Sequence, residues 1–257
     1  MIPNAEALRA LPATALLSFL GARRWFGAKG ESPRAARVRE VVPLAFGGAA
    51  DAGERSTYAL AIVEVELADG TSQRYQVPLG ARHSALGTRH SADVGEPGPP
   101  QAVLTDVEET DATATIVDAT EDPEFRRHLG EAFERGAVFA GDDVRLVIEP
   151  LSAECRVHPP ASGGSPAESR LSAAEQSNTS VIYGDAAILK LFRRLERGEH
   201  PDVEIARFLT TRTTFRNTPE LLGVIRLEDA GGSAVAGMLS RYVAGASDAW
   251  AHALQQR

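Results

Sequence analysis

The chain has 257 residues, of which 27 are basic and 35 acidic, so the formal net charge is −8 at pH 7. A hydrophobic fraction of 43% is typical of a globular protein with a buried core, in one large domain or two small ones. The acidic balance excludes a general nucleic-acid surface, and no signal peptide or long apolar run is found. We therefore expect a cytoplasmic protein without nucleic-acid or membrane partners.

Two residue types are unusually rare. Cys155 is the single cysteine, which excludes an intramolecular disulfide and a zinc site built from several cysteines. Lys29 and Lys190 are the only lysines, and every other basic residue is arginine. This bias is typical of GC-rich coding, and a lysine within it can supply the compact point charge that a planar guanidinium does not.

The first part of the chain predicts two short helical pieces followed by antiparallel strands. Apolar residues recur at helical spacing from Ala5 to Leu20, with Pro12 dividing the segment. Runs of apolar and β-branched residues predict strands at Val38–Phe46, Tyr58–Leu67 and Ser72–Leu79. The Asp69-Gly70 turn predicts that the last two strands form a hairpin. Periodicity is lost between Gly80 and Pro100, so we place a domain boundary after residue 95.

The second part mixes strands and helices. A short strand at Thr113–Asp118 precedes a helix that the Asp122-Pro123 signal starts and that should run to about Phe139. Further strands are expected at Val144–Ile148, Val181–Tyr183, Ala187–Phe192, Leu221–Leu227 and Val235–Leu239. Helices should begin at Pro201 and Trp250, and Pro159–Pro166 is expected to be a flexible stretch. The fold class is α+β with antiparallel sheet throughout.

The chemistry-bearing residues gather around Lys190. Lys190 stands between apolar residues of a predicted strand, where a buried charge needs a partner. Glu204 follows fourteen residues later in the Pro201 helix, and a small polar loop at Ser177–Ser180 precedes the strand. A strand lysine, a helix glutamate and such a loop together are typical of the nucleotide site in a kinase N-lobe. The alternative is a lysine at a sheet edge and a solvated glutamate.

Several segments of the sequence resemble those of the actinobacterial maltokinases. The segments that carry the resemblance to their N-lobe are Glu175–Asp185, Ile188–Arg194 and Pro201–Glu204. Arg24–Gly30 and Tyr75–Gly80 are similar to the N-terminal cap subdomain of that family, and Met238–Val243 is similar to its last N-lobe strand. The resemblance implies a cap at residues 1–95, a kinase-like N-lobe at 96–243 and, at 244–257, the start of a linker toward a C-lobe that lies outside the chain.

The family transfers the γ-phosphate of ATP, with Mg²⁺, to the C1 hydroxyl of maltose, and some of its members act on other sugars or are fused to trehalose synthase. The resemblance implies an ATP site in which Lys190 binds phosphates and Glu204 holds Lys190. The loop over the phosphates would be Gln176, Ser177, Asn178, Thr179 and Ser180, and the hinge beside adenine would follow Ser240, at Arg241, Tyr242 and Val243. It implies a structural role for Trp25, Phe26 and Lys29.

The chain departs from the family in one respect. No His-Gly-Asp-like catalytic loop and no carboxylates in a magnesium-binding pattern follow Lys190, so we assign no catalytic or metal-ligating residue. We expect the chain alone to contact nucleotide weakly and to transfer no phosphate. The alternatives are a non-catalytic module that docks on a separate kinase C-lobe, on trehalose synthase or on a second copy, and an incomplete aminoglycoside-phosphotransferase-like kinase.

Overall fold

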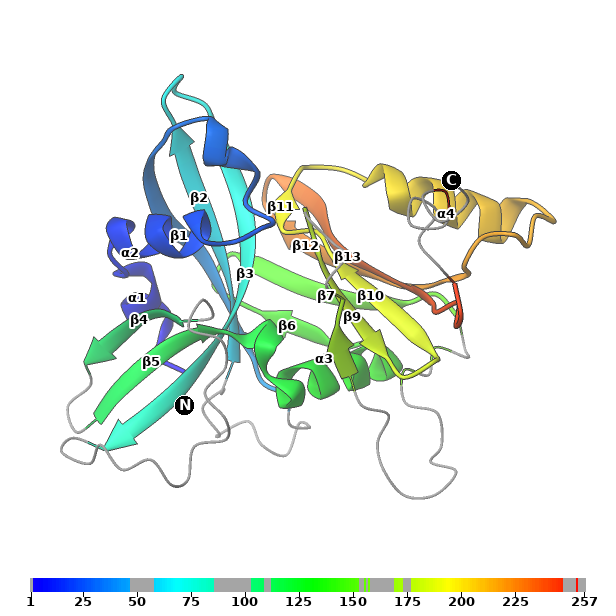
Figure 1. The fold of residues 1–257 in the computed structure, drawn as a ribbon, viewed down its shortest axis with the longest axis horizontal. Coiled ribbons are helices and arrows are strands. Elements are labelled where there is room, and N and C mark those ends of the chain that lie inside the picture. The colour runs from blue at the N-terminus through cyan, green and yellow to red at the C-terminus, as the bar shows by residue number, and fades with distance from the viewer. Residues whose placement is uncertain are drawn as a thin grey trace.

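The computed structural model describes residues 2–46, 58–85, 103–108, 112–152, 155, 157, 169–172, 177–246 and 253. Its elements form two antiparallel sheets with helices on their outer sides (Figure 1). The helices of the first half are α1 (Ala5–Arg9), α2 (Ala13–Gly21), the short 3₁₀ helices η1 (Gly27–Gly30) and η4 (Ala119–Glu121), and α3 (Pro123–Arg135). In the described part of the second half, the helix is α4 (Pro201–Arg212).

The first sheet has the strand order β1-β2-β3-β5-β4, and β11 pairs with β3 outside that path. Its strands are β1 (Pro33–Leu44), β2 (Tyr58–Leu67), β3 (Ser72–Ala85), β4 (Val103–Glu108), β5 (Ala112–Asp118) and β11 (Arg194–Leu195). Helices α1 and α2 pack on β1, and a core that includes Trp25 and Phe26 fills the space between them and the sheet. The predicted hairpin at Asp69-Gly70 is present as β2 and β3.

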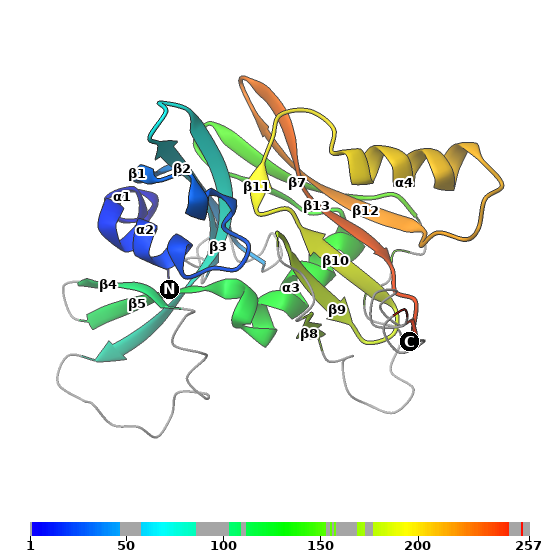
Figure 2. The same cartoon turned by 45° about the horizontal axis from the view of Figure 1, so that its top comes forward.

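The second sheet has the strand order β6-β7-β12-β13-β10-β9-β8. Its strands are β6 (Val138–Ala140), β7 (Val144–Pro150), β8 (Ser169–Leu171), β9 (Thr179–Tyr183), β10 (Ala187–Leu191), β12 (Leu221–Asp229) and β13 (Gly232–Arg241). Helix α3 buries Phe125, Leu129 and Phe133 against one face. Helix α4 buries Val203 in a smaller cluster on the other face, so the two helices lie on different sides of this sheet (Figure 2).

The ends of α3 follow from local chemistry. Asp122 accepts a hydrogen bond from the Glu124 N–H, and Pro123 supplies the first turn, as the sequence predicts. The helix ends at Arg135, earlier than the predicted Phe139, because Gly136 adopts a left-handed conformation with φ 61°. Such a backbone favours glycine and reverses the chain, so Phe139 lies in β6 instead of in the helix.

The two sheets share one core. On β2, Ala61 and Val63 face α1 and α2, whereas Leu60 and Ile62 face the core that contains α3 and the second sheet. The first part of β2 is therefore buried on both faces, beyond the one-sided burial that its alternation predicts. The first sheet therefore packs directly against the core of the second sheet.

The structure places the end of the first sheet later than the boundary expected after residue 95. Strands β4 and β5 lie beyond that boundary, yet they pair with each other and β5 pairs with β3. The first sheet consequently extends to Asp118. The expected flexible stretch at Pro159–Pro166 and most of the expected helix from Trp250 lie outside the described residues. In the part of the chain that the structure describes, no helix has the length and apolar character needed to cross a membrane.

Candidate functional site

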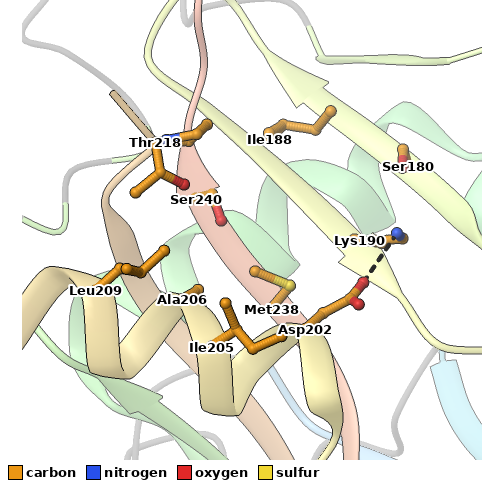
Figure 3. Close-up of a pocket in the computed structure, with 11 residues that line it drawn as sticks. Ser180, Ile188, Lys190, Asp202, Ile205, Ala206, Leu209, Thr218, Met238 and Ser240 are labelled. Atoms are coloured by element: carbon orange, nitrogen blue, oxygen red, sulfur yellow. Dashed lines mark hydrogen bonds and ion pairs between the residues drawn. The ribbon is translucent and has the colours of Figure 1, made fainter. Parts of the chain in front are cut away.

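A cavity of about 390 Å³ lies between α4 and the face of the second sheet formed by β9, β10 and β13 (Figure 3). Lys190 of β10 reaches into it, and its Nζ lies 3.2 Å from Oδ2 of Asp202 on α4. The side chain of Lys190 is 30% exposed and that of Asp202 is 46% exposed, so the ion pair sits where the cavity meets solvent.

The antiparallel register explains which side chains line the sheet side of this cavity. Lys190 is paired with Ser180 on one neighbouring strand and with Met238 on the other, and Ile188 is paired with Ser240. Cross-strand partners point to the same face, so these five side chains form one surface. The intervening residues Leu189 and Leu191 point the other way, into the main core. The sequence pattern around Lys190 is therefore that of a strand with one apolar face and one functional face.

Helix periodicity explains why Asp202, and not the predicted Glu204, meets Lys190. The α4 side chains that line the cavity are Asp202, Ile205, Ala206 and Leu209, at the i, i+3, i+4 and i+7 spacing of one helix face. Glu204 is turned by about 200° from Asp202 and is exposed, away from this face. The predicted ion pair between Lys190 and Glu204 is replaced in the structure by the pair between Lys190 and Asp202. The same spacing, read from the sequence, is the signal that identifies Asp202.

His200 holds the start of α4 in place beside the ion pair. Its Nδ1 accepts a hydrogen bond from the Asp202 N–H, and its ring stacks on Phe192 with centroids 3.7 Å apart. Burial is the largest cause that lowers the pKa of His200 below its usual value, and the charge of Lys190 acts in the same direction. The neighbouring carboxylates of Asp202, Glu196 and Glu199 act in the opposite direction. The neutral ring is the form that can accept the Asp202 N–H.

The predicted phosphate loop is divided between two faces. Ser180 lines the Lys190 cavity, and its buried Oγ meets no hydrogen-bond partner among the described residues. Asn178 and Thr179 line a different cavity, and Thr179 Oγ1 accepts a hydrogen bond from Arg193 Nε at 2.8 Å. Ser177 is exposed and accepts a hydrogen bond from Asn178, and Gln176 lies outside the described residues.

The three predicted hinge residues lie at the end of β13 and do not line the cavity. Arg241 pairs with Glu220 at 2.8 Å, and the Tyr242 N–H donates to the carbonyl of Ala186. Val243 is 53% exposed. The neighbouring Ser240 and Met238 are the β13 residues that enter the cavity.

The predicted packing role of Trp25 and Phe26 is seen in the structure. Both side chains are buried, and their rings lie near that of Tyr75, with centroids 6.1 and 5.1 Å away. Lys29, in η1, is exposed.

The fold is that of a kinase-like protein. A solved structure described as "Glucosamine kinase in complex with glucosamine, ADP and inorganic phosphate" is similar with a TM-score of 0.51 and 18% identity, over 99% of this chain and 44% of that chain. Another, "Glucosamine kinase (crystal form A)", gives a TM-score of 0.50 and 22% identity, over 99% of this chain and 45% of that one. The chain thus spans less than half the length of either structure.

The N-terminal sheet is similar to a known domain family. Residues 19–122 match the family model of the maltokinase N-terminal cap domain. This range ends just after β5 and η4, in agreement with the extent of the first sheet. The resemblance to the maltokinase cap and the α+β, kinase-like fold are both confirmed. The chain therefore has a kinase-like fold, and its residues 19–122 are similar to the maltokinase N-terminal cap domain.

Proposed function

We propose that this chain forms the nucleotide-phosphate-binding part of an ATP-dependent sugar kinase of the maltokinase type, which converts ATP and maltose to ADP and maltose 1-phosphate. The observation that carries this proposal is the Lys190–Asp202 pair in a cavity between a kinase-like sheet and its following helix. The match of residues 19–122 to the maltokinase N-terminal cap domain supports a kinase of this type.

The cavity fits a nucleotide in its size and its polar groups. A volume of about 390 Å³ lies in the range of small-molecule sites. The ammonium of Lys190 supplies a point charge for phosphate oxygens, and Asp202 keeps the amine on the cavity side of β10. Ser180 contributes a buried hydroxyl that needs an acceptor. Ile188 and Met238 offer apolar surface beside these groups, for the base.

The described residues that line the cavity do not form a magnesium site. Among the described residues, no group of three or more His, Cys, Asp or Glu side chains could hold a metal ion. Mg²⁺ in kinases is held by one or two carboxylates together with the phosphates of the nucleotide. Asp202 is the one carboxylate among the described residues that line the cavity, and it is paired with Lys190, so this lining by itself does not fit Mg²⁺.

Calorimetric titration of the chain with MgATP tests the proposal. We expect weak binding by the wild type and a loss of about tenfold or more in affinity for Lys190→Ala, because a hydrogen bond to a charged group is removed. Asp202→Asn should weaken binding as well, by loosening Lys190. Glu204→Gln is the matched control on the opposite side of α4 and should bind as the wild type does. Equal affinities of the wild type and Lys190→Ala would refute the assignment of Lys190.

An interaction module is the second candidate function, and exposed apolar side chains on α4 and just after it favour it. Ile205 and Phe208 on α4 and Phe215 just beyond it are 60%, 57% and 46% exposed. Large apolar side chains exposed on a surface are typical of sites that bind a partner. A separate kinase C-lobe, trehalose synthase or a second copy of the chain are the partners to consider. Light scattering discriminates: a concentration-dependent dimer that Phe208→Glu abolishes favours the module, and a monomer at all concentrations counts against self-association.

A further inference from the structure

A second cavity, of about 230 Å³, lies where the cap meets the second sheet. We call it the seam cavity and define it by Arg23, Asp118, Glu121, Asn178, Thr179 and Arg193, which line it. Thr179 and Ser180 are consecutive in β9 and so point to opposite faces of the strand. Since Ser180 lines the Lys190 cavity, the seam cavity lies on the other side of β9 and is separate from the proposed nucleotide site.

Arg193 is held rigidly at the inner end of the seam cavity. Its side chain is 1% exposed, and its Nη2 lies 3.2 Å from Oδ2 of Asp118. Nε donates to Thr179 and Nη2 also donates to Thr120, at 2.8 and 3.0 Å. Nη1 is buried and meets no acceptor in the part of the chain that the structure describes. One side of this guanidinium therefore has an unused donor.

Arg23, in the segment that follows α2, has more unused donors. The residue is 8% exposed, and its buried Nε and Nη2 meet no acceptor within the described ranges. No ion pair to Arg23 is formed among those residues either. Its guanidinium carbon lies 4.1 Å from the centre of the Phe19 ring, and that of Arg193 lies 4.7 Å from the Trp25 ring. Stacking on an aromatic ring fixes a guanidinium while leaving its edge donors available.

The lining of the seam cavity carries charges of both signs. Three lining residues are cationic, namely Arg23, Arg24 and Arg193, and two are anionic, Asp118 and Glu121. Burial is the largest cause that lowers the pKa of Arg23 and Arg193 lowers it further, whereas the charges of Asp118 and Glu121 raise it. Buried guanidinium donors without acceptors are costly, and an added anion that accepts from them would offset that cost.

We propose that the seam cavity binds a small oxyanion, either inorganic phosphate or the phosphoryl group of a small phosphate ester, between Arg23 and Arg193. Guanidinium groups present several donors in a fixed plane, and phosphate oxygens match that geometry. The cavity is smaller than the usual volume of a site for a drug-sized ligand, so a compact group fits it better than a nucleotide does. Asn178, at the other wall, brings an amide that can donate to the same anion.

Calorimetric titration with inorganic phosphate in a chloride buffer tests this site in the 257-residue chain. The wild type should bind one phosphate, and Arg23→Gln should bind about tenfold more weakly or worse, because charged hydrogen bonds are lost. Glu121→Gln removes a lining carboxylate and should bind phosphate more tightly than the wild type. Lys190→Met should bind as the wild type does, which separates this site from the proposed nucleotide site. Methyl phosphate in place of inorganic phosphate then shows which source is preferred.

Arg145→Gln is the control for a change in net charge, because Arg145 is exposed on β7 and pairs with Glu228. Its phosphate affinity should equal that of the wild type. The proposal is overturned if the wild type does not bind phosphate at millimolar concentration, if Arg23→Gln binds as well as the wild type, or if Lys190→Met alone loses binding. Should Arg23→Gln not fold, Glu121→Gln decides, and an affinity unchanged by that substitution refutes the site.

Discussion

Asp202 and Glu204 show how the position of a residue on a helix decides which partner its side chain can reach. Both are carboxylates in the first turn of α4, and either could pair with a strand lysine if chain distance alone decided. The helix turns them to different sides, so only Asp202 reaches Lys190. Lys190 itself could be predicted, because its setting among apolar residues and its rarity are features of the sequence. Identifying Asp202 as its partner required knowledge of the direction in which each side chain of α4 points.

The buried arginines could not be predicted from the sequence. Arg193 meets Asp118, 75 positions away, and nothing local distinguishes it from the arginines that lie on the surface. Arg23 next to Trp25 is equally ordinary in a chain whose basic residues are nearly all arginine. The contacts that make both residues notable are long-range, and they exist only after the cap is packed against β9 and β10.

Gln76 is a residue whose importance rests on such long-range contacts. From β3 its Nε2 donates to the carbonyl of Phe192 at 2.9 Å and to that of Ala236, and its N–H donates to the carbonyl of Arg193 at 2.9 Å. We expect Gln76→Met to destabilise the chain by on the order of 2 kcal/mol, because two buried carbonyls lose their donor. Urea denaturation measures this loss. Glu66→Gln, at an exposed position of β2, is the control and should change the free energy of unfolding by less than about 0.5 kcal/mol. An equally small effect of Gln76→Met would contradict the stabilising role of the Gln76 hydrogen bonds.

At the scale of elements, local signals were reliable where turns and caps define them. The Asp69-Gly70 turn correctly predicted a hairpin, and Pro201 correctly predicted the start of α4. The end of α3 was predicted too late, because the left-handed Gly136 outweighs the apolar residues that follow it. Strand β4 was not predicted, since the pairing with β5 that stabilises it lies beyond a stretch without periodicity.

The start of α4 should make the stability of the chain depend on pH. The pKa of His200 is lowered in the folded state, so between its folded value and its unfolded value of about 6.5 the unfolded chain binds more protons. Stability from neutral His200 is therefore complete above pH 6.5 and is lost as the pH falls toward the folded pKa. The midpoint of thermal unfolding should fall more between pH 7.5 and 5.5 for the wild type than for His200→Asn, which caps without titrating. Parallel pH profiles would contradict this role.

At the scale of the whole molecule, the cap and the kinase-like sheet are one structural unit. The first part of strand β2 is buried on both faces. Strand β11, which follows β10 in the chain, pairs with β3 of the first sheet, and the main core contains residues of both sheets. Length and composition were compatible with one large domain or two small ones. They could not distinguish these two organisations, because the chain has the same apolar fraction in either case. The shared core explains why the boundary expected after residue 95 is not a break in the packing.

The scarcity of lysine has a practical consequence for chemical labelling. Primary amines on side chains occur at two positions, Lys29 on the exposed η1 turn and Lys190 beside Asp202. A reagent that acylates amines consequently has one freely accessible side-chain target and one partly shielded target. Mass spectrometry measures the extent of acylation at each lysine. A ligand in the cavity should lower acylation of Lys190 and leave that of Lys29 unchanged, so Lys29 serves as an internal reference.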